Sequence, residues 1–298
     1  MEKSILYPVL QINNAHPRDQ NIQFFEEGHK YIIKTDPNSK YTSVTTWNHS
    51  HFPHFDADDI IKKMMSGKGW KEGHKYWGQT PEQIKQLWDN NKNQVSGAGT
   101  DMHYNIECFM NNPEMEPSYT HKDLYNHYLN RSLYVNESLK SQSLQSLYVN
   151  ESLEWSYFIQ YIQDTPDFKP YRTEWTIYHE DLKLAGSIDM VYENHDGTLN
   201  IYDWKRAKDI TPVNNFNKYA ISEPISHLPD SNYWHYALQL NTYKAILEEK
   251  YDKKIKDLYL VRLHPDAQEY DLIKLPDLKN EIQELFEERK KQLIMEKV

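Results

Sequence analysis

The sequence of 298 residues contains one cysteine, Cys108, which excludes an intramolecular disulfide framework and any metal site built on four cysteines. Its 9 glycines and 14 prolines are too few for a fibrous or low-complexity chain. No apolar run approaches the roughly 18–20 residues of a membrane span. The first ten residues also lack the layout of a signal peptide. We therefore expect a soluble intracellular protein that has no membrane partner.

The chain also has little positive charge relative to its negative charge. Its 34 Lys and Arg residues against 44 Asp and Glu residues give a net charge of −10. This balance excludes a generally basic surface, although a local basic channel for nucleic acid remains compatible with it. Aromatic residues are abundant at 13%. We expect a core that relies on large rings with polar tips.

The periodicity predicts one α/β domain over residues 1–298, with a mixed central sheet and helices on its faces. The first part, residues 1–98, would be a hairpin at 23–34 followed by a helical lobe. The second part, residues 99–298, would be the core. Helices are expected at 56–65, 81–91, about 100–110, 233–250 and 276–295. Strands are expected at 174–178, 184–192, 199–204 and 255–264, and a loop at 214–232.

An internal repeat interrupts this order. Residues 132–139 recur as residues 146–153, and two copies of so short a block cannot build a repeat array. We interpret the segment at about 130–153 as an insertion that lengthens a helix or a loop. A role in binding a partner is the alternative.

The chemically informative residues follow this insertion. Asp189 lies on one predicted strand, and Asp203 and Lys205 lie two residues apart on the next strand, so their side chains share a face while Trp204 points into the core. If the strands are adjacent, Asp189, Asp203 and Lys205 converge. Two carboxylates form a hard oxygen site suited to Mg²⁺ or Mn²⁺, and a lysine beside it can orient or deprotonate a water or stabilise negative charge. An Asp-x-Lys pattern alone is more often a solvated pair.

Two further patterns decide whether these residues form a catalytic metal site or a solvated pair. His103 and Glu107 lie one turn apart on a helix that begins near Gly99-Thr100, and Gln239 and Tyr243 share a face of another helix. A Gly-Thr-x-x-His helix, a Gly-x-x-Asp strand, an Asp-x-Lys strand and a Gln-x-x-x-Tyr helix occur here in that order. This set resembles the RecB-like branch of the PD-(D/E)XK nuclease superfamily over about residues 43–265. The opening hairpin is also similar to that of viral and phage members, which would act in the host cytoplasm or nucleus.

The resemblance implies a restriction-endonuclease-like core that binds Mg²⁺ or Mn²⁺. Asp189, Asp203, His103 and the carbonyl oxygen of Trp204 would hold the metal, and Lys205 would be the catalytic lysine. Some relatives hold an iron–sulfur cluster through four cysteines, which the single cysteine excludes here.

The same resemblance implies supporting roles for four residues. Gln239 and Tyr243 would hold the active-site strand and contact the nucleic-acid backbone. Glu174 would support the metal ligands or be structural. Glu107 would either reach the metal through water or remain a solvated or helix-pairing carboxylate.

DNA contact requires positive charge and stacking surfaces. Both occur in residues 62–75 and just after. We expect this stretch to lie near the cleft. The alternative is an exposed loop with scattered lysines. The predicted contacts are Lys68, Lys71, Lys75, Trp70 and Trp77, with Arg206 and Lys208 adding charge at the site. His49, His51 and His54 lie close together, but without a cysteine or a regular spacing they do not predict zinc.

The prediction is therefore a metal-dependent deoxyribonuclease, an exonuclease that acts on DNA with a free end or on single strands, in recombination, repair or replication. Two alternatives remain. One is an endonuclease of the same fold that cuts DNA or RNA internally. The other is a catalytically idle subunit for DNA binding or assembly. Protein partners are not predicted.

Overall fold

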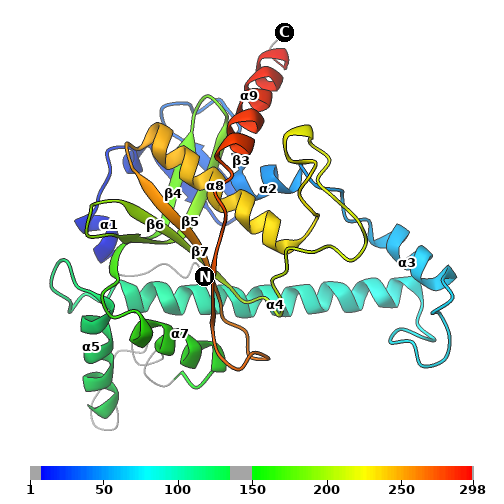
Figure 1. The fold of residues 1–298 in the computed structure, drawn as a ribbon, viewed down its shortest axis with the longest axis horizontal. Coiled ribbons are helices and arrows are strands. Elements are labelled where there is room, and N and C mark those ends of the chain that lie inside the picture. The colour runs from blue at the N-terminus through cyan, green and yellow to red at the C-terminus, as the bar shows by residue number, and fades with distance from the viewer. Residues whose placement is uncertain (1–7, 135–149, 297–298) are drawn as a thin grey trace.

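The computed structural model describes residues 8–134 and 150–296, and it confirms an α/β fold with a mixed central sheet between helices (Figure 1). Six of the described strands form this sheet. They are β3 (Thr42–Ser43), β4 (Lys169–His179), β5 (Leu184–Glu193), β6 (Leu199–Lys205), β7 (Ile255–Arg262) and β8 (Asp271–Lys274). The hydrogen-bonded order is β3-β5-β6-β7-β8, and β4 pairs with β5. The β3–β5 and β6–β7 pairs are parallel, and the others are antiparallel.

Strands β5 and β6 separate in the middle of the sheet. Their ladder runs from Glu193↔Leu199 to Met190↔Tyr202 and ends there. Further along the same edge of β5, the short strand β3 pairs with Leu184 and Ala185. Asp189 and Asp203 are the first residues past the last ladder pair, so the predicted functional positions lie where the two strands part.

Helices cover both faces of the sheet (Figure 1). On one face, α2 (Val44–His49), α8 (Asn232–Lys250) and α9 (Lys279–Met295) contribute to a core cluster that also contains Ile201 and Leu260. On the other face, α4 (Pro81–Met110), α5 (His121–Tyr134) and α7 (Leu153–Asp164) contribute to a second cluster. Trp204 belongs to the second cluster, so the prediction that it points into the core is confirmed.

Helix α4 is one continuous helix, and the prediction of two helices at 81–91 and about 100–110 was wrong. Its start is fixed by a capping box between Thr80 and Gln83, with Pro81 in the first turn. Gly97 and Gly99 lie between the two predicted helices, and each glycine costs a helix about 1 kcal/mol. The continuous helix of 30 residues shows that the cap and the buried face of the last turns offset that cost.

The other predicted elements agree with the structure within a few residues. The hairpin of β1 (Ile22–Phe25) and β2 (Lys30–Ile33) turns at Gly28, whose φ of 77° is left-handed. Helix α3 (Ala57–Ser66) begins at the side-chain cap Asp56. Described elements outside the expected ranges are α1 (Val9–Asn13), β3, α2, α5, α7, β8 and two short 3-10 helices, Asp19–Asn21 and Glu223–Ile225.

The duplicated block falls largely on residues 135–149, which lie outside the described residues, so its interpretation as an insertion stays a prediction. The predicted boundary between residues 98 and 99 falls inside α4, and the division of the chain into two parts also stays a prediction. Among the described residues, no helix has the length and apolar character that crossing a bilayer requires.

Candidate metal centre

Three side chains from three different elements form a group that could hold a metal ion. His103 on α4, Glu174 on β4 and Asp189 on β5 each offer one ligand atom, and these atoms lie within 4.8 Å of one another. His103 Nδ1 is 3.5 Å from Asp189 Oδ2 and 3.8 Å from Glu174 Oε1. His103 Nε2 lies 3.0 Å from the carbonyl oxygen of Trp204. Imidazole, carboxylate and carbonyl donors together suit a divalent cation.

The position of Asp189 follows from the separation of β5 and β6. With the strand ladder broken at this point, Asp189 Oδ2 accepts a hydrogen bond of 3.0 Å from the backbone N–H of Trp204. The carboxylate thus takes the place of a strand carbonyl and ties the two strands together. The same bond holds Asp189 close to the Trp204 peptide, whose oxygen contacts His103.

Glu174 joins this group through an unusual backbone conformation. Its φ of 41° is left-handed, although it lies within β4. The pairs Thr173↔Met190 and Trp175↔Ile188 flank it, so Glu174 lies opposite Asp189. Ser187 Oγ donates a hydrogen bond of 3.0 Å to Glu174 Oε2. Such a conformation costs about 1–3 kcal/mol and is concentrated at functional sites. The sequence predicted Glu174 as a supporting or structural residue, whereas the structure groups it with His103 and Asp189.

Asp203 and Lys205 form an ion pair beside this group. Lys205 Nζ lies 2.6 Å from Asp203 Oδ2 and 4.7 Å from the ring centroid of Tyr236 on α8. Asp203 is only 2% exposed. It is not one of the three grouped residues, because its carboxylate faces Lys205. The metal-ligand role predicted for Asp203 therefore remains a prediction.

The electrostatics of the site indicate an excess of negative charge. Burial and the neighbouring Asp189 raise the pKa of Asp203 to about 6. Burial also raises the pKa of Asp189. Burial opposes a charged His103, but Asp189 and Glu174 raise its pKa to about 9. The three carboxylates of Asp189, Asp203 and Glu174 are balanced only by the positive charges of Lys205 and a protonated His103. A divalent cation would relieve this imbalance, and His103 must lose its proton to become a ligand.

The predicted supporting residues lie around the same strands. Gln239 Nε2 donates a hydrogen bond of 3.1 Å to Tyr243 Oη, and Tyr243 packs on Gly186 of β5. A Cβ atom at position 186 would lie 2.6 Å from Tyr243 Cε1, so only glycine permits this packing. Glu107 lies one turn beyond His103, and burial, followed by the charge of Glu174, raises its pKa to about 8.

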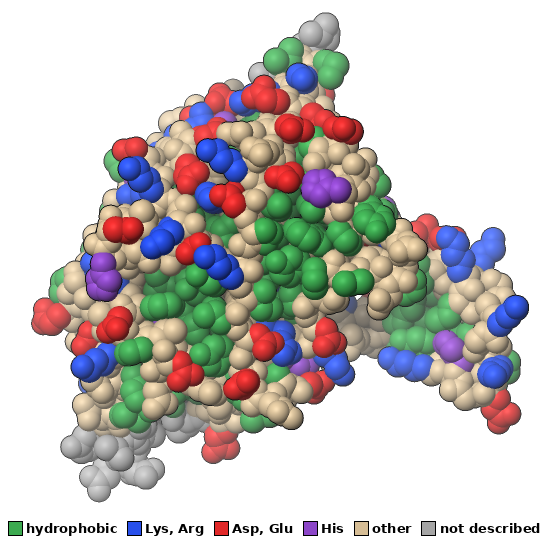
Figure 2. Space-filling model, in the orientation of Figure 1, with side chains coloured by type: hydrophobic (Ala, Val, Ile, Leu, Met, Phe, Trp, Pro, Cys, Tyr) green, Lys and Arg blue, Asp and Glu red, His purple; other side chains and the backbone are tan. Residues whose placement is uncertain are grey.

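The predicted DNA-binding stretch lies elsewhere. We call residues 56–80, which comprise α3 and the loop after it, the aromatic–lysine lobe. It packs on the first half of α4, where Trp88 Nε1 donates a hydrogen bond of 3.0 Å to Tyr76 Oη. The helix rise separates Trp88 from His103 by roughly 22 Å. The expectation that this stretch lies beside the cleft was therefore wrong, and Figure 2 shows the lobe projecting from the body of the molecule.

Within the lobe, Trp70 and Trp77 lie with their ring centroids 5.8 Å apart, and Trp77 is 48% exposed. Lys68, Lys71 and Lys75 are exposed. The two predicted contacts near the site are already paired: Arg206 Nε with Glu154 Oε1 at 2.6 Å, and Lys208 Nζ with Asp266 Oδ2 at 3.3 Å.

The sequence did not predict a cavity that begins at Lys205. We call it the Lys205 pocket. It measures about 320 Å³ and is lined by Thr45, Asn48, His49, Lys205, Asn232, His235, Tyr236 and Gln239. The lining residues on α8 are spaced three and four residues apart, and this spacing is the signal from which the sequence could have predicted that they share one helix face. The residues from α2 lie almost 190 positions earlier, and nothing in the sequence links the two segments.

Comparison with known proteins identifies the family of the chain. The model of the PD-(D/E)XK nuclease superfamily matches residues 79–297, which include the metal group, Asp203 and Lys205. No curated protein matches the chain. A crystal structure from Eubacterium rectale, provisionally named an exonuclease, is similar at 16% sequence identity with a TM-score of 0.31. The similarity covers 62% of this chain and 69% of that chain, and its TM-score is too low to support any argument.

Proposed function

We propose, on the premise that this chain belongs to the PD-(D/E)XK nuclease superfamily, that it is a metal-dependent deoxyribonuclease of the RecB-like branch that degrades DNA from free ends. One observation carries the proposal. The group of His103, Glu174 and Asp189 lies next to the Asp203–Lys205 ion pair, at the point where β5 and β6 separate. Potential metal ligands and a lysine thus occur together at one position of a nuclease fold.

Nucleases of this superfamily use divalent metals, and the donor set here fits Mg²⁺ or Mn²⁺. His103, Asp189, Asp203 and the carbonyl oxygen of Trp204 are the proposed ligands, and Glu174 joins them on the strength of its position. When bound, the ion would act as a Lewis acid on the phosphodiester and lower the pKa of an attacking water.

Lys205 is the proposed catalytic lysine. Burial opposes its charge, but Asp203 and Asp189 raise its pKa, so the ammonium group stays protonated at neutral pH. Asp203 fixes Nζ from one side and the ring of Tyr236 from another. A charge held in this way can stabilise the negative charge that develops on the phosphate without first reorganising, an effect worth on the order of 10²–10³-fold in rate.

The remaining residues position the strands and the substrate. Tyr243 packs on Gly186, which supports the proposed role of Gln239 and Tyr243 in holding β5. The aromatic–lysine lobe offers exposed lysines and two tryptophans, a combination that suits single-stranded DNA. Arg206 and Lys208 are the proposed contacts closer to the site. Degradation of DNA ends would serve recombination, repair or replication, in a viral setting if the likeness to viral members holds.

Digestion of matched circular and linear DNA tests the proposal. The same single strand is prepared as a covalently closed circle and as an end-labelled linear molecule, and each is incubated with Mg²⁺ or Mn²⁺, with and without EDTA. We expect loss of the linear strand, survival of the circle and no cleavage in EDTA. Equal digestion of the circle would support an endonuclease instead. No cleavage with either metal would support an idle DNA-binding subunit.

A further inference from the structure

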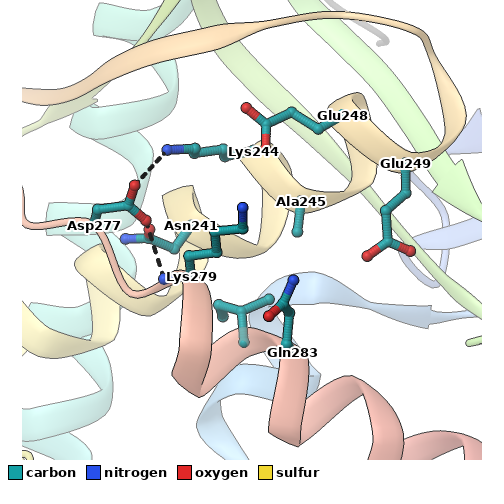
Figure 3. Close-up of a pocket in the computed structure, with 9 residues that line it drawn as sticks. Asn241, Lys244, Ala245, Glu248, Glu249, Asp277, Lys279 and Gln283 are labelled. Carbon is teal, nitrogen blue, oxygen red and sulfur yellow. Dashed lines mark hydrogen bonds and ion pairs between the residues drawn. The ribbon is translucent and has the colours of Figure 1, made fainter.

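The two ends of helix α8 have different surroundings. Beside its C-terminal half lies a cavity between α8 and α9 (Figure 3), in which the polar groups already have partners. Lys244 Nζ pairs with Asp277 Oδ2 at 2.8 Å. Asn241 Nδ2 donates to the carbonyl oxygens of Ala237 and Pro276. A cavity whose hydrogen bonds are already made gains little from a ligand. The N-terminal end of α8 instead follows a long loop with exposed apolar side chains.

The connection between β6 and α8 is unusually long. It spans residues 206–231, and its single helical element is the short 3-10 helix Glu223–Ile225. Connections in compact domains have a median length of about 4–6 residues, and those longer than about 12–15 residues are usually either functional or disordered. Here backbone hydrogen bonds fix the chain: Ala220 N donates to Leu228 O at 3.0 Å, and Asp230 N donates to Lys218 O at 2.9 Å. An ordered loop of this length indicates a function.

We call residues 213–221 of this connection the Phe216 loop. Asn214 shapes its tip, because its Oδ1 accepts a hydrogen bond of 2.7 Å from Phe216 N while its Nδ2 donates to the carbonyl oxygen of Asp230. Asn217 follows with a left-handed φ of 50°, which turns the chain back. The loop therefore has a defined shape and presents Phe216 at its tip.

Four exposed apolar side chains lie in the Phe216 loop. Val213 is 60% exposed, Phe216 82%, Tyr219 47% and Ile221 65%. Single exposed apolar residues are common on protein surfaces, whereas a group of them marks an interaction site. At this exposure Phe216 adds little to the core, so the stability of the fold does not explain its presence.

The polar neighbours of Phe216 indicate the kind of partner. Asn215, Asn217 and Lys218 are exposed beside it, and these polar groups oppose insertion into a membrane. Lysine is also depleted in protein–protein interfaces. An aromatic ring next to an ammonium group is the combination found in sites for single-stranded nucleic acid. Residues 210–222 contain no acidic residue, although the chain as a whole has a net charge of −10. The loop therefore suits an anionic partner that has flat rings.

The Phe216 loop lies between the candidate metal centre and the aromatic–lysine lobe. The connection that carries it begins directly after Lys205, the last residue of β6. At its other end, Ile221 N donates a hydrogen bond of 2.8 Å to the carbonyl oxygen of His51, in the segment that leads from α2 to the lobe. In that segment Phe55 is 64% exposed, with its ring centroid 6.1 Å from that of Trp88. Figure 1 shows the loop, in yellow, at the edge of the body towards α3.

We infer that the Phe216 loop binds single-stranded DNA between the lobe and the metal centre, with the ring of Phe216 stacked on an unpaired base. Lys218 contacts a phosphate beside that base. Because bases inside a duplex stack on one another, this contact favours unpaired DNA. The inference rests on the proposed nuclease function and identifies the surface over which the substrate strand reaches the site.

Binding of two matched strands tests the inference. One is an end-labelled oligodeoxythymidylate, and the other is a strand of the same length made of stable abasic residues. Both carry the same phosphates, but only the first can stack on a ring. Affinities are measured by fluorescence anisotropy in EDTA for the wild type, Phe216→Ala, Phe216→Trp and Ile294→Ala. Ile294, which is 65% exposed near the end of α9, supplies the matched control.

The expected effect of Phe216→Ala depends on the bases. Affinity for the oligodeoxythymidylate should fall about tenfold, or about 1.4 kcal/mol, which lies in the range of one base–aromatic stack. Affinity for the abasic strand should be nearly unchanged. Phe216→Trp should bind at least as tightly as the wild type, and Ile294→Ala should match it. Lys218→Gln should lower the slope of log K against log salt by about 0.7, whereas Phe216→Ala should leave the slope unchanged.

Several results would overturn the inference. These are equal binding of the oligodeoxythymidylate by the wild type and Phe216→Ala, an equal loss on both strands, an equal loss in Ile294→Ala, and no binding by the wild type. Unchanged DNA binding together with lost binding to vesicles of phosphatidylcholine and phosphatidylserine in Phe216→Ala would assign the loop to a membrane surface instead. Thermal unfolding verifies that each variant folds.

The assay needs no turnover, so its outcome is independent of cleavage. A wild type that binds DNA through Phe216 but cleaves none with either metal would retain the binding surface and reject the nuclease function. A wild type that cleaves DNA and binds it equally well without Phe216 would retain the nuclease function and reject the inference.

Discussion

The two halves of α4 have different surroundings. In the second half, Met102, Ile106, Phe109 and Met110 are buried in the cluster that packs under the sheet, and this half carries His103. In the first half only Ile84 is buried, and it belongs to neither large cluster. The first half instead supports the aromatic–lysine lobe through Trp88 and Tyr76. One helix thus joins the part that carries the candidate metal centre to a smaller part with its own contacts.

Under the proposed function, this difference would separate the part that positions the chemistry from the part that binds the substrate. The metal group needs fixed distances, and the core around the second half of α4 supplies them. The lobe needs only to present lysines and rings, and a weakly packed element can do that. Substitutions in the two halves should therefore affect stability, activity and DNA binding in different ways.

The largest expected contrast in stability is between two isoleucines on the same helix. Ile106→Ala removes a side chain that is 1% exposed in the core, and we expect a loss of about 2–5 kcal/mol in the free energy of global unfolding. Ile84→Ala removes an equally buried side chain from the first half of α4, which supports the lobe. It should leave the global transition nearly unchanged and increase hydrogen exchange in residues 56–95. Denaturant unfolding and hydrogen exchange measure the two effects, and equal global destabilisation would show that the lobe is part of the main core.

A buried histidine below the second half of α4 should make the core sensitive to acid. His121 is fully buried, with Nδ1 2.8 Å from Thr165 Oγ1 and Nε2 2.9 Å from Tyr192 Oη. Burial lowers the pKa of His121 to about 3. The unfolded chain, with a histidine pKa near 6.5, therefore binds a proton below that pH while the folded chain does not. Stability should fall as the pH drops from about 6.5 towards 3.

The contribution of His121 between pH 7 and pH 5 should be about 2 kcal/mol. Urea unfolding at the two pH values measures it. His121→Gln should be less stable at pH 7 but should lose less stability on acidification than the wild type. His195→Gln, at an exposed position, is the control and should retain the full loss. An unchanged pH dependence in His121→Gln would mean that other groups set the acid sensitivity.

The smallest expected effect concerns the lobe. Exchanging Lys68, Lys71 and Lys75 for alanine should weaken binding of single-stranded DNA and lower the slope of log K against log salt by about 2, since each phosphate contact contributes roughly 0.7. The rate at saturating DNA should not change, because the lobe lies away from the metal group. A triple variant at Lys254, Lys256 and Lys274, which are also exposed, is the control. Equal salt slopes for the two triple variants would remove the lobe from the DNA path.

Local patterns predicted much of this fold, and the misses have physical causes. The hairpin at 23–34 and the helix that starts near residue 56 rest on signals within a few residues, and both predictions agree with the structure. The continuity of α4 was missed because Gly97 and Gly99 are unfavourable locally, while the packing that overrides them involves α7 and the sheet. The same reason applies to α5, whose first residue His121 is held by contacts with Thr165 and Tyr192.

Prediction of the candidate site was limited in the same way, by contacts that arise only in the folded chain. The spacing of Asp203 and Lys205 placed them on one strand face, and the structure pairs them at 2.6 Å. The position of Glu174 could not be predicted, because it depends on a left-handed residue within a strand. Nor could Asn48 be assigned to the Lys205 pocket, since α2 and α8 meet only in the folded chain.

Exchange of Lys205 for alanine tests most directly whether the chemistry occurs at the end of β6. The control is Lys254→Ala, an exposed lysine beside the opposite end of the same strand, where the carbonyl oxygen of Lys254 accepts from Leu199 N. Initial rates on end-labelled linear DNA with Mg²⁺ or Mn²⁺ are compared with the wild type, and thermal unfolding verifies that both variants fold. We expect Lys205→Ala to lose on the order of 10²–10³-fold in rate with little change in DNA binding, and Lys254→Ala to keep the wild-type rate. A folded Lys205→Ala protein that cleaves at the wild-type rate would contradict the assignment of the active site.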